Sequence, residues 1–392
     1  MLPAAIMAAA LFALLAFAPF ASAASDPVAS GTTTVKLNSG FVKKLKKNDI
    51  KVLKVRPAKL KGHKATFTVT GGELDPTTGL GTLTLSGGLK FKAGKRTAPV
   101  KALVVNTAKK SLTGTVAGKK MKVASITGSS FARNGFGVNL TIKSMKLTGK
   151  AAKRLNKKLG FSGNKGKSKR AATSKASELP FKGNQVLGSA TSETQPSTVV
   201  ILPGGNATLT TALPTVTKLA KDKVEIALIA PTTLGSAGPP PAFAFPISGG
   251  TISPAATAGI VQTAGGLKLS QVWVAGEKET NMTLSAIYVD LGAKTATVEV
   301  TVESKGLDPK LNLGVLGRSS IADISLTGAT ITADPATRTV SVQNATATLQ
   351  AVTAEVLNSV FAKPFEAITS AKAETFAAGD PLGTFSFTAQ TQ

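Results

Sequence analysis

The chain has 392 residues, enough for two or three domains of about 150 residues, and 42% of them are hydrophobic, so a sizeable core can be buried. It contains no Cys, one His, one Trp and one Tyr, which excludes disulfides, thiolate nucleophiles, cysteine-held metals and multi-histidine metal sites. The net charge of +27 is unevenly spread: residues 1–200 contain 35 basic and 6 acidic side chains, and residues 201–392 contain 12 and 14.

The first segment predicts export. Residues 4–18 are an unbroken apolar run, and Ala21-Ser22-Ala23 follows with the small side chains that signal peptidase requires, although no Lys or Arg precedes the run. We therefore interpret residues 1–23 as a signal peptide of a secreted or cell-surface protein. The alternative is a retained membrane anchor, but the run is shorter than the ~20 residues needed to span a bilayer. No transmembrane span is expected after signal removal.

A sequence segment occurs twice. Residues 67–91 and 245–269 match at a constant offset, which indicates a tandem duplication. The shared positions are Phe67, Gly71, Gly72, Pro76, Gly81, Gly87, Gly88, Leu89 and Lys90, which recur as Phe245, Gly249, Gly250, Pro254, Gly259, Gly265, Gly266, Leu267 and Lys268. We predict a basic first domain at residues 30–196, with a Lys-rich flexible tract at about 160–178, and a near-neutral second domain at residues 197–392.

Each copy has mostly the pattern of strands. Alternating runs rich in Val, Thr, Ile and Leu are separated by Gly, Pro, Asn and Asp clusters, as in antiparallel hairpins with one buried face. In the first copy these runs are 64–70, 81–86, 101–106 and 111–116. Short helices are predicted at 41–47 and 148–159, with counterparts at 216–221 and 351–361. The predicted fold is mainly β: two tandem sandwich-like domains, each with two short helices.

The repeat resembles a known family. A strand-rich repeat that opens with a short helix, contains a GGxxxP…G…GGL(K)F core and ends with a helix and a strand is similar to the HtaA domain. The resemblance covers nearly all of the chain after residue 23, twice. It implies an exported actinobacterial surface protein that binds heme and passes it towards an uptake system.

The family's heme ligands are replaced in this chain. The resemblance implies a Tyr in a pattern like S-F-x-x-Y at the first helix and a His in a G-H pair after the glycine-rich strand. Here Lys44 or Leu45 stands at the Tyr position, and Lys95 stands at the His position. Tyr, His and Met can also ligate heme iron from elsewhere in a fold, which leaves His63, Tyr288 and Met282 as possible ligands. The two candidates are His63, in a Lys-rich loop, and Tyr288, in a strand-like run.

The basic first copy offers a second kind of site. The candidate residues for binding a polyanion lie on the two predicted helices and are Lys43, Lys44, Lys46, Lys47, Lys153, Arg154, Lys157 and Lys158. Such an array binds polyanions with strong salt dependence. For an exported protein, anionic wall polymers and lipid headgroups are the expected partners; no motif for sequence-specific nucleic-acid reading is present. An alternative is a solvated face that keeps the domain soluble.

Two functions therefore remain open. The first is heme binding for iron acquisition, and the second is adhesion of a non-heme surface domain to anionic polymers. Catalysis is not expected, because no residues supply a nucleophile, a base and an orienting group. The close acidic pair Glu73 and Asp75 is replaced by Thr251 and Ser253 in the second copy, so Asp75 is interpreted as a turn residue.

Overall fold

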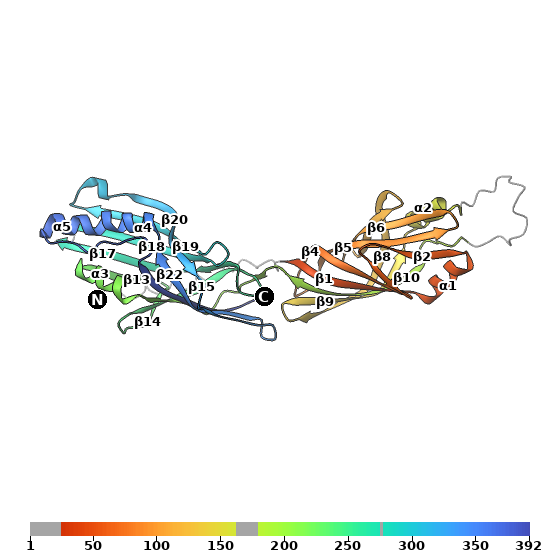
Figure 1. Cartoon of the computed structure of the whole chain (residues 1–392), viewed down its shortest axis with the longest axis horizontal. Coiled ribbons are helices and arrows are strands. Elements are labelled where there is room, and N and C mark those ends of the chain that lie inside the picture. The colour runs from red at the N-terminus through yellow and green to blue at the C-terminus, as the bar shows by residue number, and fades with distance from the viewer. Residues whose placement is uncertain (1–24, 162–178, 275–276) are drawn as a thin grey trace, which may run out of the picture.

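The computed structural model describes residues 25–161, 179–274 and 277–392. These residues form two antiparallel sheets in tandem, drawn end to end in Figure 1. We call them unit 1, whose strands run from Asp26 to Pro196, and unit 2, whose strands run from Val199 to Gln390. The prediction of a mainly β chain with two tandem strand-rich units and short helices is confirmed.

Unit 1 contains ten strands and two helices among the described residues. They are β1 (Asp26–Leu37), α1 (Ser39–Lys47), β2 (Ile50–Val55), β3 (Lys59–Lys61), β4 (Lys64–Leu74), β5 (Gly81–Ala93), β6 (Arg96–Asn106), β7 (Ser111–Val116), β8 (Lys119–Asn134), β9 (Gly137–Leu147), α2 (Gly149–Leu159) and β10 (Val186–Pro196).

Unit 2 repeats this order with some elements divided. Its elements are β11 (Val199–Val200), β12 (Asn206–Thr211), α3 (Leu213–Lys221), β13 (Val224–Ile229), β14 (Thr233–Ser236), β15 (Ala242–Ile252), β16 (Gly259–Thr263), β17 (Gly266–Val274), β18 (Lys278–Asp290), β19 (Thr295–Lys305), η1 (Pro309–Leu311), β20 (Gly314–Ser325), β21 (Thr330–Asp334), β22 (Thr339–Leu349), α4 (Ala351–Leu357), the π-helical segment η2 (Asn358–Ala362), α5 (Lys363–Thr369) and β23 (Pro381–Gln390).

Each sheet closes on itself. In unit 1 the order β5-β6-β7-β8-β9-β10-β1-β4 is completed by a pairing between β4 and β5, so eight strands form a ring around one core. In unit 2, β16 pairs with both β15 and β18 and closes the corresponding ring. The sandwich-like packing predicted from alternation is thus produced by opposite walls of one sheet, whose inward residues face each other.

The repeated segment has the same register in both units. Gly71 pairs with Thr84 and Gly72 with Leu83, as Gly249 pairs with Gln262 and Gly250 with Val261. Phe67 and Phe245, at equivalent places, are each 1% exposed. The shared strand order and register support the interpretation of the chain as tandem copies.

Two repeated glycines are required by close backbone contacts. Gly87 has φ +87° and Gly265 has φ +82°, a region that favours glycine. A Cβ on Gly87 would lie 2.5 Å from the Ala58 nitrogen, and one on Gly265 would lie 2.7 Å from the Thr232 nitrogen. At this place the loop after β2 in unit 1, and the loop after β13 in unit 2, lies against the sheet, and only glycine leaves room for it.

The last helical segment of unit 2 is longer than predicted. The predicted helix ends at residue 361, but the chain remains helical to Thr369. A π-helical segment, η2, separates α4 from α5, so Pro364 lies in the first turn of α5, where its missing N–H costs no helical hydrogen bond.

The two units meet through side chains at their junction. Phe136, in the turn between β8 and β9, is 5% exposed and belongs to a core cluster of unit 2 with Val199 and Ile201. Arg133 of β8 donates hydrogen bonds to the backbone oxygens of Phe136, at 3.3 Å, and of the C-terminal Gln392. The C-terminus accordingly lies between the units in Figure 1.

Candidate ligand-binding site

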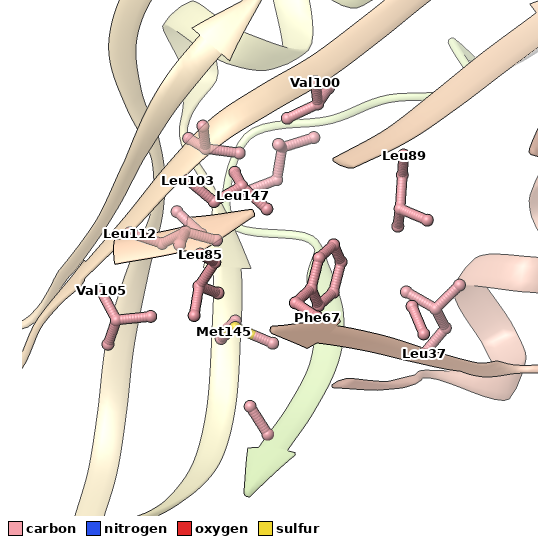
Figure 2. Packing of buried hydrophobic residues seen from close by; sticks show 14 of the residues in the cluster. Leu37, Phe67, Leu85, Leu89, Val100, Leu103, Val105, Leu112, Met145 and Leu147 are labelled. Carbon is pink, nitrogen blue, oxygen red and sulfur yellow. The ribbon is translucent and has the colours of Figure 1, made fainter. Parts of the chain in front are cut away.

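The interior of unit 1 contains an apolar cavity of about 80 Å³. Phe67, Leu85 and Met145 are among the side chains that point into it from different strands, as Figure 2 shows. Leu37 and Phe41 line it at the end where α1 begins, and Leu155 lines it from α2. This space is enclosed by carbon and offers a ligand no charged contact.

Unit 2 contains a corresponding cavity of about 120 Å³. It is lined by Leu219 of α3, Leu357 of α4 and the buried thioether of Met282. Pockets for drug-sized ligands measure roughly 300–1,000 Å³, so neither interior has room for a porphyrin. Any ligand of that size must bind outside these two cavities.

A cluster of three Phe rings fills the end of unit 1 between its helices. Phe41 of α1, Phe91 of β5 and Phe181 make edge-to-face contacts, with ring centroids 5.2 to 6.3 Å apart. Asn156 of α2 fixes the third ring: its amide nitrogen donates to the Phe181 oxygen at 2.8 Å, and its amide oxygen accepts from the Phe181 nitrogen at 3.3 Å. The cluster thus brings α1 and α2 to the same end.

The same asparagine contact occurs in unit 2. Asn358 donates to the Phe376 oxygen at 2.9 Å and accepts from the Phe376 nitrogen at 2.7 Å. The sequence analysis did not single out Asn156 or Asn358. Their place as the last residue of two similar segments, KLTGKAAKRLN and TLQAVTAEVLN, was the available signal.

Most of the predicted polyanion-binding residues are brought together at this end. Lys43, Lys46 and Lys47 are exposed on α1, and Lys153, Lys157 and Lys158 are exposed on α2. Both helices lie at the end of unit 1 that faces away from unit 2 (Figure 1). We call these six residues the lysine cluster. Its cationic groups are available to an anion in solvent.

Two of the predicted cations have less exposed places. The guanidinium of Arg154 donates to the backbone oxygens of Val116 and Ala117, both at 2.6 Å, and so holds the turn between β7 and β8. Lys44 is half-buried, and burial, with a smaller effect from Lys182, lowers the pKa of its ammonium group. Leu45, the other residue at the family's Tyr position, is fully buried in the core.

His63 lies at the end of unit 1 that carries α1. It is exposed in the turn between β3 and β4, and its backbone oxygen accepts a hydrogen bond from Leu37 at 2.8 Å, directly before α1 begins. His63 does not line the cavity of unit 1. Its imidazole is therefore presented to solvent beside the first helix.

Tyr288 lies in unit 2, on β18, so the structure does not bring it together with His63. The guanidinium of Arg318 covers the Tyr288 ring, with 3.8 Å between its central carbon and the ring centroid. Arg318 is in turn paired with Glu299, with Nε 3.1 Å from Oε1. Tyr288 is thus part of a packed cation–π contact on a sheet face.

The acidic turn of unit 1 is used for local structure. The Asp75 carboxylate accepts hydrogen bonds from the backbone and hydroxyl of Thr77, at 2.7 and 2.6 Å, and from Thr78. Burial raises the pKa of Asp75, but these hydrogen bonds outweigh it and the net pKa is lowered. The interpretation of Asp75 as a turn residue is confirmed. Within residues 25–161, 179–274 and 277–392, no cluster of three acidic or His side chains could hold a metal ion.

The family comparison matches unit 2. Residues 215–367, from α3 to α5, match the HtaA family model. This part of the chain is similar to the HtaA domain. Comparison with curated proteins gave no significant match. None of the helices in the described part of the chain has the length and hydropathy that crossing a bilayer requires.

Solved HtaA and HtaB structures also match. The N-terminal domain of HtaA from Corynebacterium glutamicum is 16% identical and matches over 49% of this chain and 99% of that chain, with a TM-score of 0.35. The C-terminal domain of the same HtaA is 13% identical and matches over 50% of this chain and 99% of that chain, with a TM-score of 0.34. The heme binding protein HtaB from Corynebacterium glutamicum is 14% identical and matches over 50% of this chain and 96% of that chain, with a TM-score of 0.33.

Proposed function

We propose that this protein is an exported, non-enzymatic binding protein of the HtaA type that holds heme at the cell surface. The observation that carries the proposal is the match of residues 215–367 to the HtaA family model. The solved protein HtaB, which matches about half of this chain, is a heme binding protein. The segment proposed to direct export, residues 1–23, lies outside the described residues.

The proposed heme site is the helix-bearing end of unit 1. The exposed imidazole of His63 is the donor for the iron, since His is a common axial ligand of heme. The lysine cluster lies at the same end and supplies ammonium groups for the two heme carboxylates. Tyr288 is the weaker of the two candidate ligands because Arg318 covers its ring.

A hemin titration followed in the Soret region tests the proposed site. We expect a saturable shift in the wild-type protein that His63→Ala abolishes and that Tyr288→Phe leaves unchanged. The matched control is Lys143→Ala, an exposed residue on β9. If His63→Ala titrates like the wild type, His63 is not the ligand; if Tyr288→Phe alone abolishes the shift, the site belongs to unit 2.

Adhesion to an anionic wall polymer is the second candidate function. The observation that favours it is the confinement of the charge to one half of the chain, with 35 basic and 6 acidic residues in the first 200. Counterion release would make such binding fall steeply with salt. If hemin associates without saturation and is removed by salt, while a phosphate polymer binds tightly, this second function replaces the first.

A further inference from the structure

One strand of unit 2 has an open, apolar edge. β20 pairs with β19 along Gly314–Asp323, with register shifts that leave Leu316 and Ile321 unpaired, but it pairs with β22 only from Ala322 onward. On the side away from β19, residues 314–319 therefore have no strand partner among the described residues. Val315 in this segment is 79% exposed, the largest exposed fraction among the exposed large hydrophobic side chains, and Leu316 is 43% exposed. Leu313, just before the strand, is 44% exposed.

The equivalent edge of unit 1 is protected by charge. β8 pairs with β7 from Lys119 and with β9 from Ala124, which leaves a corresponding open segment. That segment carries Lys119, Lys120 and Lys122, all exposed. Lysines on an edge strand oppose pairing with another strand, because the approaching edge must bring charges together or bury them.

The two edges end in the same way, so the comparison is between equivalent places. In unit 1 the backbone nitrogen of Thr148, just before α2, donates to the Val123 oxygen at 2.9 Å. In unit 2 the nitrogen of Gln350, just before α4, donates to the Ile321 oxygen at 3.1 Å. In this register Lys119, Lys120 and Lys122 correspond to Gly317, Arg318 and Ser320. The copies therefore differ in the chemistry of the edge, because unit 2 has one arginine where unit 1 has three lysines.

The charge on the open edge of unit 2 is compensated. Arg318 is the charged residue of the segment; its Nε lies 3.1 Å from Oε1 of Glu299, and its guanidinium lies over the Tyr288 ring. Both partners lie on strands of the same sheet. Two copies of this edge can therefore approach each other without bringing unpaired like charges together.

We propose that residues 314–319 of β20 pair antiparallel with the same residues of a second copy of this chain. An antiparallel strand pair with a twofold axis is self-complementary, so one edge segment serves both copies. The pairing extends each sheet across the axis and removes Val315 and its apolar neighbours from water. Val352 is the second residue of α4, the helix that begins beside β20. Its side chain is 69% exposed and adds to the apolar surface there.

Light scattering on the purified chain at micromolar concentration tests the proposal. We expect a dimer for the wild type, a monomer for Val315→Lys, which adds a positive charge to this edge, and a dimer for Leu80→Lys. Leu80 is the matched control because it is 48% exposed in a turn of unit 1. A monomeric wild type, or a dimer that Val315→Lys leaves intact, overturns the proposal.

Cysteine cross-linking gives a second readout that does not depend on charge. The chain has no cysteine, so Val315→Cys and Leu316→Cys each introduce a single thiol. Under mild oxidation we expect one of them to form a covalent dimer in high yield, while Leu80→Cys stays monomeric. Cross-linking at residues 315 and 316 no greater than at residue 80 contradicts strand pairing.

Discussion

At the scale of single residues, two buried side chains make testable contributions that composition gave no reason to expect. Asn156 is 4% exposed and satisfies both backbone groups of Phe181. Asp26 is also 4% exposed, but neither of its carboxylate oxygens has a hydrogen-bond partner. Asn156 therefore stabilises the folded state, whereas the buried carboxylate of Asp26 destabilises it.

Removal of the Asn156 amide should destabilise unit 1. Asn156→Ala leaves a buried N–H and a buried C=O without partners, which costs about 2–4 kcal/mol in the free energy of unfolding. Denaturant unfolding measures the loss. The control is Asn312→Ala, an exposed residue for which we expect a change within about 0.5 kcal/mol. An equal effect for the two variants would show that the contact to Phe181 contributes little.

Asp26 should make stability depend on pH. Burial raises its pKa from 3.8 to about 6, against the opposing effect of Arg133, while Asp75 adds to the rise and the Val200 backbone opposes it. Since folding favours the protonated form, the contribution of Asp26 to stability is most favourable below about pH 4 and is lost as the pH rises through about 6.

The variant Asp26→Asn tests this pH dependence. At pH 7 the variant should be more stable than the wild type by about 1–2 kcal/mol, a value reduced for partial solvent screening. Near pH 4 the difference should vanish. Unfolding curves at several pH values measure it, and a difference that does not change with pH would contradict the assignment to the Asp26 carboxyl.

At the scale of elements, the sequence predicted the strands and helices well because their signals are local. Alternation located β4 to β7, and apolar spacing located α1 and α2. The helix around Pro364 was predicted too short, because the π-helical segment that accommodates the proline depends on packing. Sheet closure through β4 and β5 also depends on contacts between distant segments.

The candidate site was predictable only in part. The lysines of α1 and α2 were visible as charge runs in the sequence. Their position at one end of unit 1 depends on contacts between Phe41, Phe91 and Phe181, which lie far apart in the sequence. Likewise, no sequence pattern showed that Arg318 covers Tyr288 or that Arg154 holds a turn. Side-chain partners of this kind are set by the tertiary fold.

The lysines of α1 allow a direct test of polyanion binding at the level of one helix. The triple variant Lys43→Gln, Lys46→Gln, Lys47→Gln should weaken binding to a soluble polyphosphate and reduce the salt slope of the binding constant by about 2–3, because a neutral glutamine displaces no counterion from the polymer. Its charge-matched control replaces three exposed lysines of unit 2, Lys294, Lys305 and Lys310, by Gln. Equal weakening by the two triple variants would mean that net charge, and not the α1 surface, determines binding.

At the scale of the whole molecule, two units with one strand order differ in charge, in edge chemistry and in the residues beside the first helix. Unit 1 has exposed lysines on both helices and His63 near α1. Unit 2 contains the HtaA match and the apolar edge of β20. We infer a division of roles, in which unit 1 contacts the ligand and unit 2 joins two copies of the chain.

The proposed function requires that the chain bind heme at one defined site. Titration of the protein with hemin at low and at high salt, with the bound heme counted at saturation, tests this requirement. We expect saturation at one heme per chain, with a Soret shift that persists at high salt and requires His63. Binding that does not saturate, or that high salt removes completely, would contradict it.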